Sequence, residues 1–161
     1  MSLVVDDAPL DLLTGNVMTK QGNQKIQEDG RVIPSPPAIL LVEDAEENRM
    51  VLEAFLRPLN CQLKTAENGA EAVEMFVQER FSVVLMDIEM PVMDGIEATV
   101  NIRAWEKQNQ IDAPTPIFAL TGHSSGEELR RCLESGCNHC LTKPVRKQQL
   151  LDTVRPFLGG E

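Results

Sequence analysis

Short apolar runs alternate with longer amphipathic segments along most of the chain. Runs of strand length predict β-strands at AILLV (38–42), QLKTA (62–66), SVVLM (82–86), PIFAL (116–120) and HCLT (139–142). The run at 62–66 is the least apolar of them, so we expect it at an edge of the sheet.

Segments with helical periodicity fill the gaps between these runs. Apolar residues spaced i, i+3, i+4 predict helices over 46–57, 69–79, 95–107, 125–135 and 146–158. In the first helix we expect the face that packs on the sheet to carry Met50, Val51, Ala54 and Phe55. Gly136 and Gly159 stand where a left-handed residue would end a helix.

Alternating strands and helices predict an α/β fold with a parallel sheet. Five such units are too few to close an eight-stranded barrel, so we expect an open, doubly wound five-stranded sheet. Ligands of such sheets bind beyond the carboxyl ends of the strands. Functional residues are therefore expected where each strand ends.

The start of the chain has a different texture. Residues 14–38 are rich in Gly, Pro and polar residues and finish in PSPP, which is typical of an extended linker. We therefore predict an N-terminal extension and linker over 1–37, a folded domain over 38–158 and a C-terminal tail over 159–161.

The first residues contain a stretch similar to the start of that domain. LVVDDAPLDLL (3–13) aligns with LLVEDAEENRM (40–50), which suggests a truncated repeat or a chance match. Some thirty residues are too few for a second sheet. A further alternative is that residues 3–5 add a strand to a sheet edge, in this chain or in a neighbouring one.

Polar residues with complementary chemistry follow the predicted strands. Glu43 and Asp44 follow the first strand, Asp87 the third, Thr121 the fourth and Lys143 the fifth. If the first and third strands are neighbours, the three acids converge, and an all-oxygen cluster suits Mg²⁺. Solvated loop acids are the alternative in a chain with 25 acidic residues, but the joint placement with the threonine and the lysine favours a site.

A carboxylate held beside Mg²⁺ can act as a nucleophile toward phosphorus. We therefore expect Asp87 to accept a phosphoryl group, while the Thr121 hydroxyl and the Lys143 ammonium hold its oxygens. The expected metal ligands are Asp44, which binds directly, Glu43, which binds through water, Asp87 and the backbone carbonyl of Glu89.

Four ordered motifs resemble those of the receiver domain of two-component response regulators: VED (42–44), MDIEMPVMDG (86–95), ALTG (119–122) and CLTKPV (140–145). The resemblance covers about residues 38–158. It implies a flavodoxin-like strand order 2-1-3-4-5 and transfer of a phosphoryl group to Asp87 from a histidine kinase or a histidine phosphotransfer protein. It also allows the chain to be a receiver from a hybrid histidine kinase.

The resemblance also implies roles for individual residues. Thr121 would turn toward the phosphoryl group, Lys143 would contact it, and the bond before Pro144 would be cis. In the family an aromatic residue three positions before the lysine takes part in the switch, and this chain departs from that pattern with Cys140. The surface expected to change is the fourth helix, fifth strand and fifth helix, read by a downstream protein partner.

Two further residues are expected to tune the lifetime of the phosphoryl group. Glu89 lies two residues after the acceptor and His123 two residues after the threonine. A carboxylate or an imidazole there can orient or repel an attacking water. A solvated loop position is the alternative for His123.

Charge and cysteine content narrow the function classes. The chain has 25 acidic and 15 basic residues and a net charge of −10, which argues against nucleic-acid binding. The sequence predicts no membrane-spanning segment and no secretory signal, so we expect a cytoplasmic protein with reduced thiols. Whether it forms a homodimer is left open.

Several alternatives have their own sequence markers. Cys137 and Cys140 form a C-x-x-C around His139, but no second pair accompanies them, so we favour structural cysteines over a zinc or redox site.

An aspartyl-phosphate phosphatase should have a second aspartate where Glu89 stands, and a flavin protein should have a hydroxyl-rich loop where EDAEEN stands. A receiver-like scaffold that is never phosphorylated should lack an acceptor or metal acid. We expect a signalling domain that catalyses its own phosphotransfer and dephosphorylation, not a conventional enzyme.

Overall fold

Parallel strands form the central sheet of the molecule. The computed structural model describes residues 16–19, 22–26, 32–34 and 36–159. The sheet has the order β5-β4-β6-β7-β8, with strands β4 (Ala38–Val42), β5 (Gln62–Ala66), β6 (Val83–Asp87), β7 (Ile117–Thr121) and β8 (His139–Thr142). Counted along the domain this is the order 2-1-3-4-5, so the predicted doubly wound, flavodoxin-like sheet is confirmed. The less apolar β5 lies at an edge, as predicted.

Two strands end one residue later than the apolar pattern predicts. β6 ends at Asp87, which lies opposite Leu120, and β7 ends at Thr121, which lies opposite Thr142. The side-chain pattern missed this because a polar residue can pair its backbone in a ladder as well as an apolar one. Both polar residues are therefore positioned by the sheet itself.

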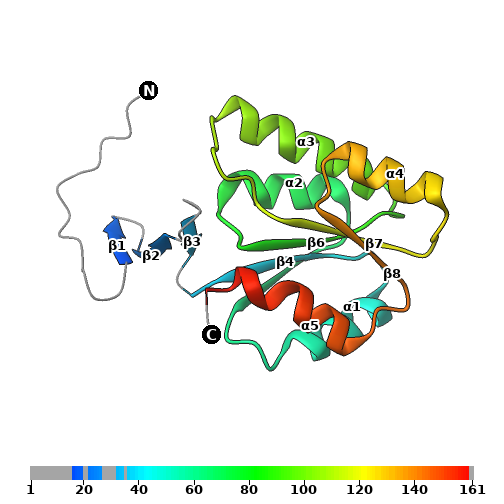
Figure 1. The fold of residues 1–161 in the computed structure, drawn as a ribbon, viewed down its shortest axis with the longest axis horizontal. Helices are drawn as coiled ribbons and strands as arrows, with labels where there is room; N and C mark the ends of the chain where they lie inside the picture. Colours follow the sequence, from blue (N-terminus) through cyan, green and yellow to red (C-terminus); the bar gives the residue numbers. More distant parts are fainter. Residues whose placement is uncertain (1–15, 20–21, 27–31, 35, 160–161) are drawn as a thin grey trace.

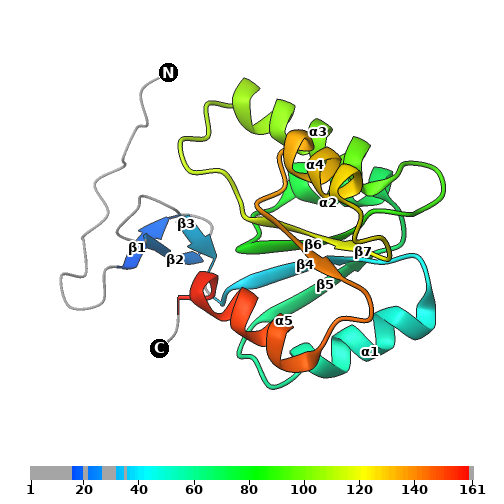
Figure 2. The same ribbon diagram turned by 45° about the vertical axis from the view of Figure 1, so that its right-hand side comes forward.

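Helices cover both faces of the sheet (Figures 1 and 2). The helices α2 (Gly69–Gln78), α3 (Gly95–Gln108) and α4 (Gly126–Ser135) lie on one face. The helices α1 (Glu46–Leu56) and α5 (Lys147–Val154) lie on the other. All five start and end within a few residues of the predicted bounds, except that α5 gives way early to the 3₁₀ turn η1 (Arg155–Phe157). Pro156 explains this change, because it has no backbone N–H to continue the α-helix.

Each face of the sheet has its own apolar core. One core packs Phe76, Ala98, Ile102 and Cys132 against β4, β6 and β7. The other packs Leu52, Leu56, Leu150 and Val154 against alternate residues of the same strands. The central strands are buried on both faces, which explains why their sequences are continuous apolar runs.

The helix α1 packs on the sheet through a different stripe from the predicted one. Leu52 and Leu56 are 5% and 1% exposed, whereas Met50 and Val51 are 61% and 51% exposed. The prediction was wrong because the segment carries apolar residues on more than one side, so helical periodicity alone admits two stripes. Of the predicted face, only Phe55 packs against the core.

The segment expected to be an extended linker contains a second, small sheet, so the expectation that it was too short to form one was wrong. Three short strands form an antiparallel sheet: β1 (Asn16–Thr19), β2 (Gly22–Ile26) and β3 (Val32–Pro34). β2 is largely polar, and none of the three strands alternates apolar and polar residues, so the pattern that predicts a strand was absent. The predicted repeat at 3–13 lies outside the described residues.

Two glycines and one peptide bond match the sequence expectations. Gly136 has φ of 111° and ends α4, and Gly159 has φ of 65°. The peptide bond between Lys143 and Pro144 is cis. No helix in the described part of the chain is long and apolar enough to span a membrane.

Candidate functional site

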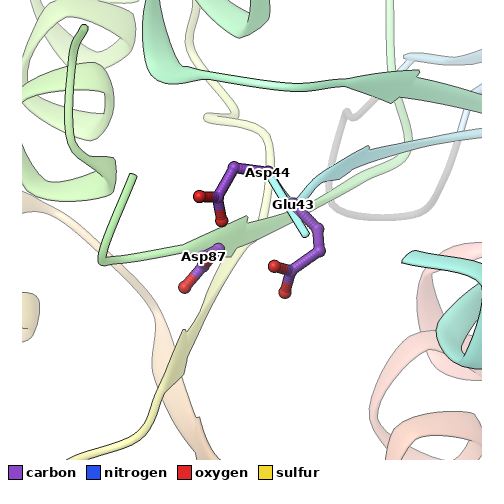
Figure 3. Close-up of side chains that lie close together, drawn as sticks. All are labelled: Glu43, Asp44 and Asp87. Carbon is purple, nitrogen blue, oxygen red and sulfur yellow. The ribbon is translucent and has the colours of Figure 1, made fainter. Parts of the chain in front are cut away.

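Three carboxylates converge at the carboxyl edge of the sheet. Glu43 and Asp44 follow β4, and Asp87 ends the neighbouring strand β6. One oxygen from each lies within 4.8 Å of the others, and Figure 3 shows the three side chains gathered around a common point. Among the described residues, this is the only group of three or more potential metal ligands that converges in this way.

Lys143 faces these carboxylates from the end of β8. Its Nζ lies 2.7 Å from Glu43 Oε2 and 3.1 Å from Asp87 Oδ1. The two carboxyl side chains are 1% and 4% exposed, so these charge-assisted contacts are sheltered from water. One ammonium against three carboxylates leaves the cluster short of positive charge.

The pKa of Asp87 is raised above its ordinary value. Burial raises the pKa of this carboxyl group to about 7, the Lys143 charge opposes that rise, and the Glu43 and Asp44 carboxylates add to it. A divalent cation among the acids would favour the ionised form of Asp87. The donor set, made of carboxylate oxygens, fits Mg²⁺ better than a soft metal.

The pKa of Lys143 is also shifted. Burial alone would lower the pKa of the ammonium group. The hydrogen bond to Glu43 and the charge of Asp87 outweigh burial and raise this pKa above its usual value. Lys143 is therefore a permanent cation in the site.

Thr121 lies at the same edge, at the end of β7. Its hydroxyl donates to the backbone oxygen of His123 at 3.2 Å and accepts from the His123 N–H at 3.1 Å. The hydroxyl thus turns toward its own loop. To contact a group on Asp87, it would have to exchange these local hydrogen bonds.

Glu89 and His123 meet above the strand ends. His123 Nε2 lies 2.7 Å from Glu89 Oε1, and both side chains are about two thirds exposed, at 64% and 65%. The Glu89 N–H donates to Asp87 Oδ1 at 3.3 Å. The pair therefore joins the loops after β6 and β7, next to the acceptor carboxylate.

The loop from Asp87 to α3 also contains Asp94, which caps the helix and is not one of the three converging carboxylates. The Asp94 carboxylate accepts from the Glu97 N–H at 2.8 Å and caps the first turn of α3. Gly95 follows, and a Cβ there would lie 2.1 Å from the backbone oxygen of Asp87. The glycine lets the chain pass close to the acceptor residue.

The C-x-x-C motif lies in the apolar layer and not at the strand ends. Cys137 is buried, Cys140 is half-buried and His139 is exposed. Burial raises the pKa of Cys132 to about 12 and also raises that of Cys140, so these thiols stay protonated. Cys140 packs with Cys132 in the core formed by α2, α3 and α4.

One residue of the site was missed from the sequence. Arg49 of α1 donates from Nη1 to the backbone oxygen of Glu43 at 3.1 Å. The sequence pattern predicts an ordinary surface position for an arginine in the first turn of a helix. The one sequence signal that could have identified Arg49 is its place shortly after Glu43 and Asp44.

The family described as "Response regulator receiver domain" matches residues 39–155. The sensor protein GacS of Pseudomonas syringae is 39% identical over 123 residues, which are 76% of this chain and 14% of that protein. The response regulator mcs4 of Schizosaccharomyces pombe is 32% identical over 164 residues, covering 88% of this chain and 31% of that protein. The chain thus spans less than a third of these relatives.

Two solved structures share the fold and much of the sequence. The receiver domain of Ssk1 from Saccharomyces cerevisiae, in a co-crystal with the histidine phosphotransfer protein Ypd1, has a TM-score of 0.72 and 38% identity, with 79% of this chain and 91% of that chain covered. The receiver domain of the sensor histidine kinase PA1611 from Pseudomonas aeruginosa, with a magnesium ion in its active-site cleft, has a TM-score of 0.67 and 35% identity, with 77% and 98% covered.

Proposed function

The chain belongs to the response regulator receiver family, a family of signalling domains, and from that premise we propose that it accepts a phosphoryl group on Asp87 from a phosphohistidine in a Mg²⁺-dependent phosphorelay. The observation that carries the proposal is the convergence of Glu43, Asp44 and Asp87 opposite Lys143. A cluster of three acids and one fixed cation is suited to a phosphoryl group bound together with a metal.

The residues around Asp87 divide the chemistry between them. In the transfer, a carboxylate oxygen of Asp87 forms a bond to phosphorus as the bond from phosphorus to the donor histidine nitrogen breaks, and that nitrogen takes up a proton. Lys143 lies 3.1 Å from Asp87 Oδ1 and is placed to hold a phosphoryl oxygen. The metal, held by Glu43, Asp44, Asp87 and the carbonyl of Glu89, would neutralise the charge on the transferring group.

The donor is proposed from the chemistry and from the relatives. Ssk1 was crystallised with a histidine phosphotransfer protein, and GacS is a sensor protein. We propose that this chain takes its phosphoryl group from a histidine kinase or a histidine phosphotransfer protein in the cytoplasm. Residues 38–158 would form the receiver, and the chain would be part of a hybrid kinase or a response regulator.

The output would follow from a change in Thr121. A phosphoryl group on Asp87 brings close to two negative charges and three acceptor oxygens. The Thr121 hydroxyl would leave His123 to donate to one of them, and Cys140 would follow in place of the family's aromatic residue. We propose that a downstream protein reads the resulting change on α4, β8 and α5.

Phosphorylation by a small donor tests this function. The protein is incubated with acetyl phosphate, with Mg²⁺ or with EDTA, and its intact mass is measured. We expect a gain of one phosphoryl group that needs Mg²⁺ and is lost on treatment with hydroxylamine. Asp87→Asn should abolish the gain, and Asp112→Asn, at an exposed position far along the chain, should leave it unchanged. No gain from this donor or from a phosphohistidine protein would favour an unphosphorylated scaffold.

A further inference from the structure

We propose that Arg49 is a positioning residue of the magnesium site: it holds the peptide that joins Glu43 to Asp44 and thereby sets where the Asp44 carboxylate lies. This inference rests on the proposed function, because it concerns the same metal site. Arg49 lies in the first turn of α1, directly after the loop that carries both acids.

Arg49 makes two contacts, and they differ in length and in exposure to solvent. Its Nη1 donates to the backbone oxygen of Glu43 at 3.1 Å, and the Arg49 side chain is only 15% exposed. Its Nη2 lies 3.5 Å from the carboxylate of Glu67, whose side chain is 68% exposed. An exposed pair at that distance contributes little. The bond to the Glu43 carbonyl is therefore the main role of the guanidinium.

That carbonyl belongs to the peptide unit that leads into Asp44. A peptide unit is planar, so holding its oxygen fixes the rotation of the whole unit and the point from which the next side chain starts. The N–H of Glu43 is fixed from the other side, because it donates to the Ala66 oxygen at 3.1 Å. Asp44 itself is exposed, so packing does little to hold its side chain.

Charge and position predict opposite effects when Arg49 is removed. The Arg49 guanidinium is bonded to the Glu43 carbonyl beside the site, and its positive charge repels a cation bound there, so loss of that charge alone would strengthen Mg²⁺ binding. Loss of the hold on the Asp44 peptide would weaken binding, as changes in residues that orient metal ligands typically do. The direction of the change in Kd therefore separates the two roles.

The test is a calorimetric titration of the full chain with MgCl₂. We expect Arg49→Met to raise the Kd for Mg²⁺ about tenfold, and Arg49→Lys, which keeps a donor and the charge, to raise it less. Arg57→Met and Arg57→Lys, at the exposed far end of the same helix, are the matched controls and should bind as wild type does. Circular dichroism at the titration temperature checks that each variant is folded.

A second readout separates this role from a general loss of structure. The rate of labelling by acetyl phosphate in Arg49→Met should fall at low Mg²⁺ and return to the wild-type rate at saturating Mg²⁺. An unchanged or lower Kd in Arg49→Met, with wild type binding Mg²⁺, overturns the positioning role and leaves the proposed function intact. Failure of the wild-type chain to bind Mg²⁺ would instead overturn both.

Discussion

Asp87 is buried, although its proposed role as a nucleophile requires an ionised carboxylate. The residue is 3% exposed and ends a strand that is apolar up to that point. Burial raises the pKa of Asp87 to about 7, although the nearby Lys143 ammonium opposes that rise. Such a group lowers the stability of the fold in exchange for reactivity, which is common at functional sites.

This raised pKa makes a prediction about stability and pH. The pKa of Asp87 is about 7 in the folded state against 3.8 for the ordinary group, so the folded state binds the proton more tightly than the unfolded state does. The contribution of Asp87 to the free energy of unfolding therefore falls as pH rises from about 4 to about 7. In EDTA at pH 8, Asp87→Asn should be more stable than wild type by about 1 kcal/mol or more.

Urea unfolding of both proteins at pH 5 and pH 8 measures this difference. The advantage of Asp87→Asn should shrink at pH 5, because wild type is then largely protonated at this position. The exposed Asp112→Asn serves as control and should show no such trend. An advantage of equal size at both pH values would contradict the raised pKa.

Gly95 makes a separate prediction, because it has no room for a side chain. A Cβ at this position would lie 2.1 Å from the Asp87 oxygen, and that atom belongs to the backbone. We expect Gly95→Ala to lower the free energy of unfolding by about 2 kcal/mol or more. Gly126→Ala, which also starts a helix but meets nothing within 4 Å, should be neutral or slightly stabilising. Equal thermal midpoints for the two variants would contradict the close contact between position 95 and the Asp87 backbone oxygen.

A polar network joins the elements next to the amino ends of β7 and β8. Arg103 of α3 donates to the backbone oxygens of Gly136 and Thr115 and to the side chains of Glu106 and Asn138, at 2.7 to 2.9 Å. Glu106 is 3% exposed and also accepts from the Thr115 N–H. The network ties the end of α3 to the start of β7 and to the turn between α4 and β8.

Removing one member of this network should be costly. Arg103→Met leaves the buried Glu106 carboxylate without its cation, so we expect it to lower the free energy of unfolding by about 3 kcal/mol. Glu106→Gln keeps hydrogen-bonding groups and loses only the charge, and it should cost clearly less. Guanidinium unfolding of the two single variants compares them. A larger loss in Glu106→Gln than in Arg103→Met would refute the ranking.

Within the folded domain, the strand order was implied by the resemblance to the receiver family, whereas the sequence pattern itself was enough to predict an open, doubly wound sheet, its edge strand and the placing of the acids. These features follow from apolar runs and from the rule that ligands of such sheets bind where strands end. The small sheet β1–β3 was not predictable, because its strands show no alternation of apolar and polar residues, and two further features were also missed. The helix α1 has apolar residues on more than one side, and the sequence does not tell which side packs on the sheet. Arg49 acts through the backbone oxygen of Glu43, and side-chain patterns do not describe backbone contacts.

Metal binding should also stabilise the whole fold. A ligand that binds only the folded state adds about 2.7 kcal/mol to the free energy of unfolding at a concentration one hundred times its Kd. We therefore expect MgCl₂ to raise the thermal midpoint of wild type. Asp44→Asn, which removes a proposed ligand, should lose most of that rise, and CaCl₂ should be a poorer substitute. A rise of equal size in Asp44→Asn would place the ion elsewhere.

The central claim is that Asp87 carries the phosphoryl group, and borohydride reduction after labelling tests it most directly. Borohydride converts an aspartyl phosphate to homoserine, so peptide mass spectrometry locates the modified residue. We predict homoserine at position 87 only in samples that received both donor and Mg²⁺. Homoserine at another acidic position, or none in a sample whose intact mass had risen, would contradict the account.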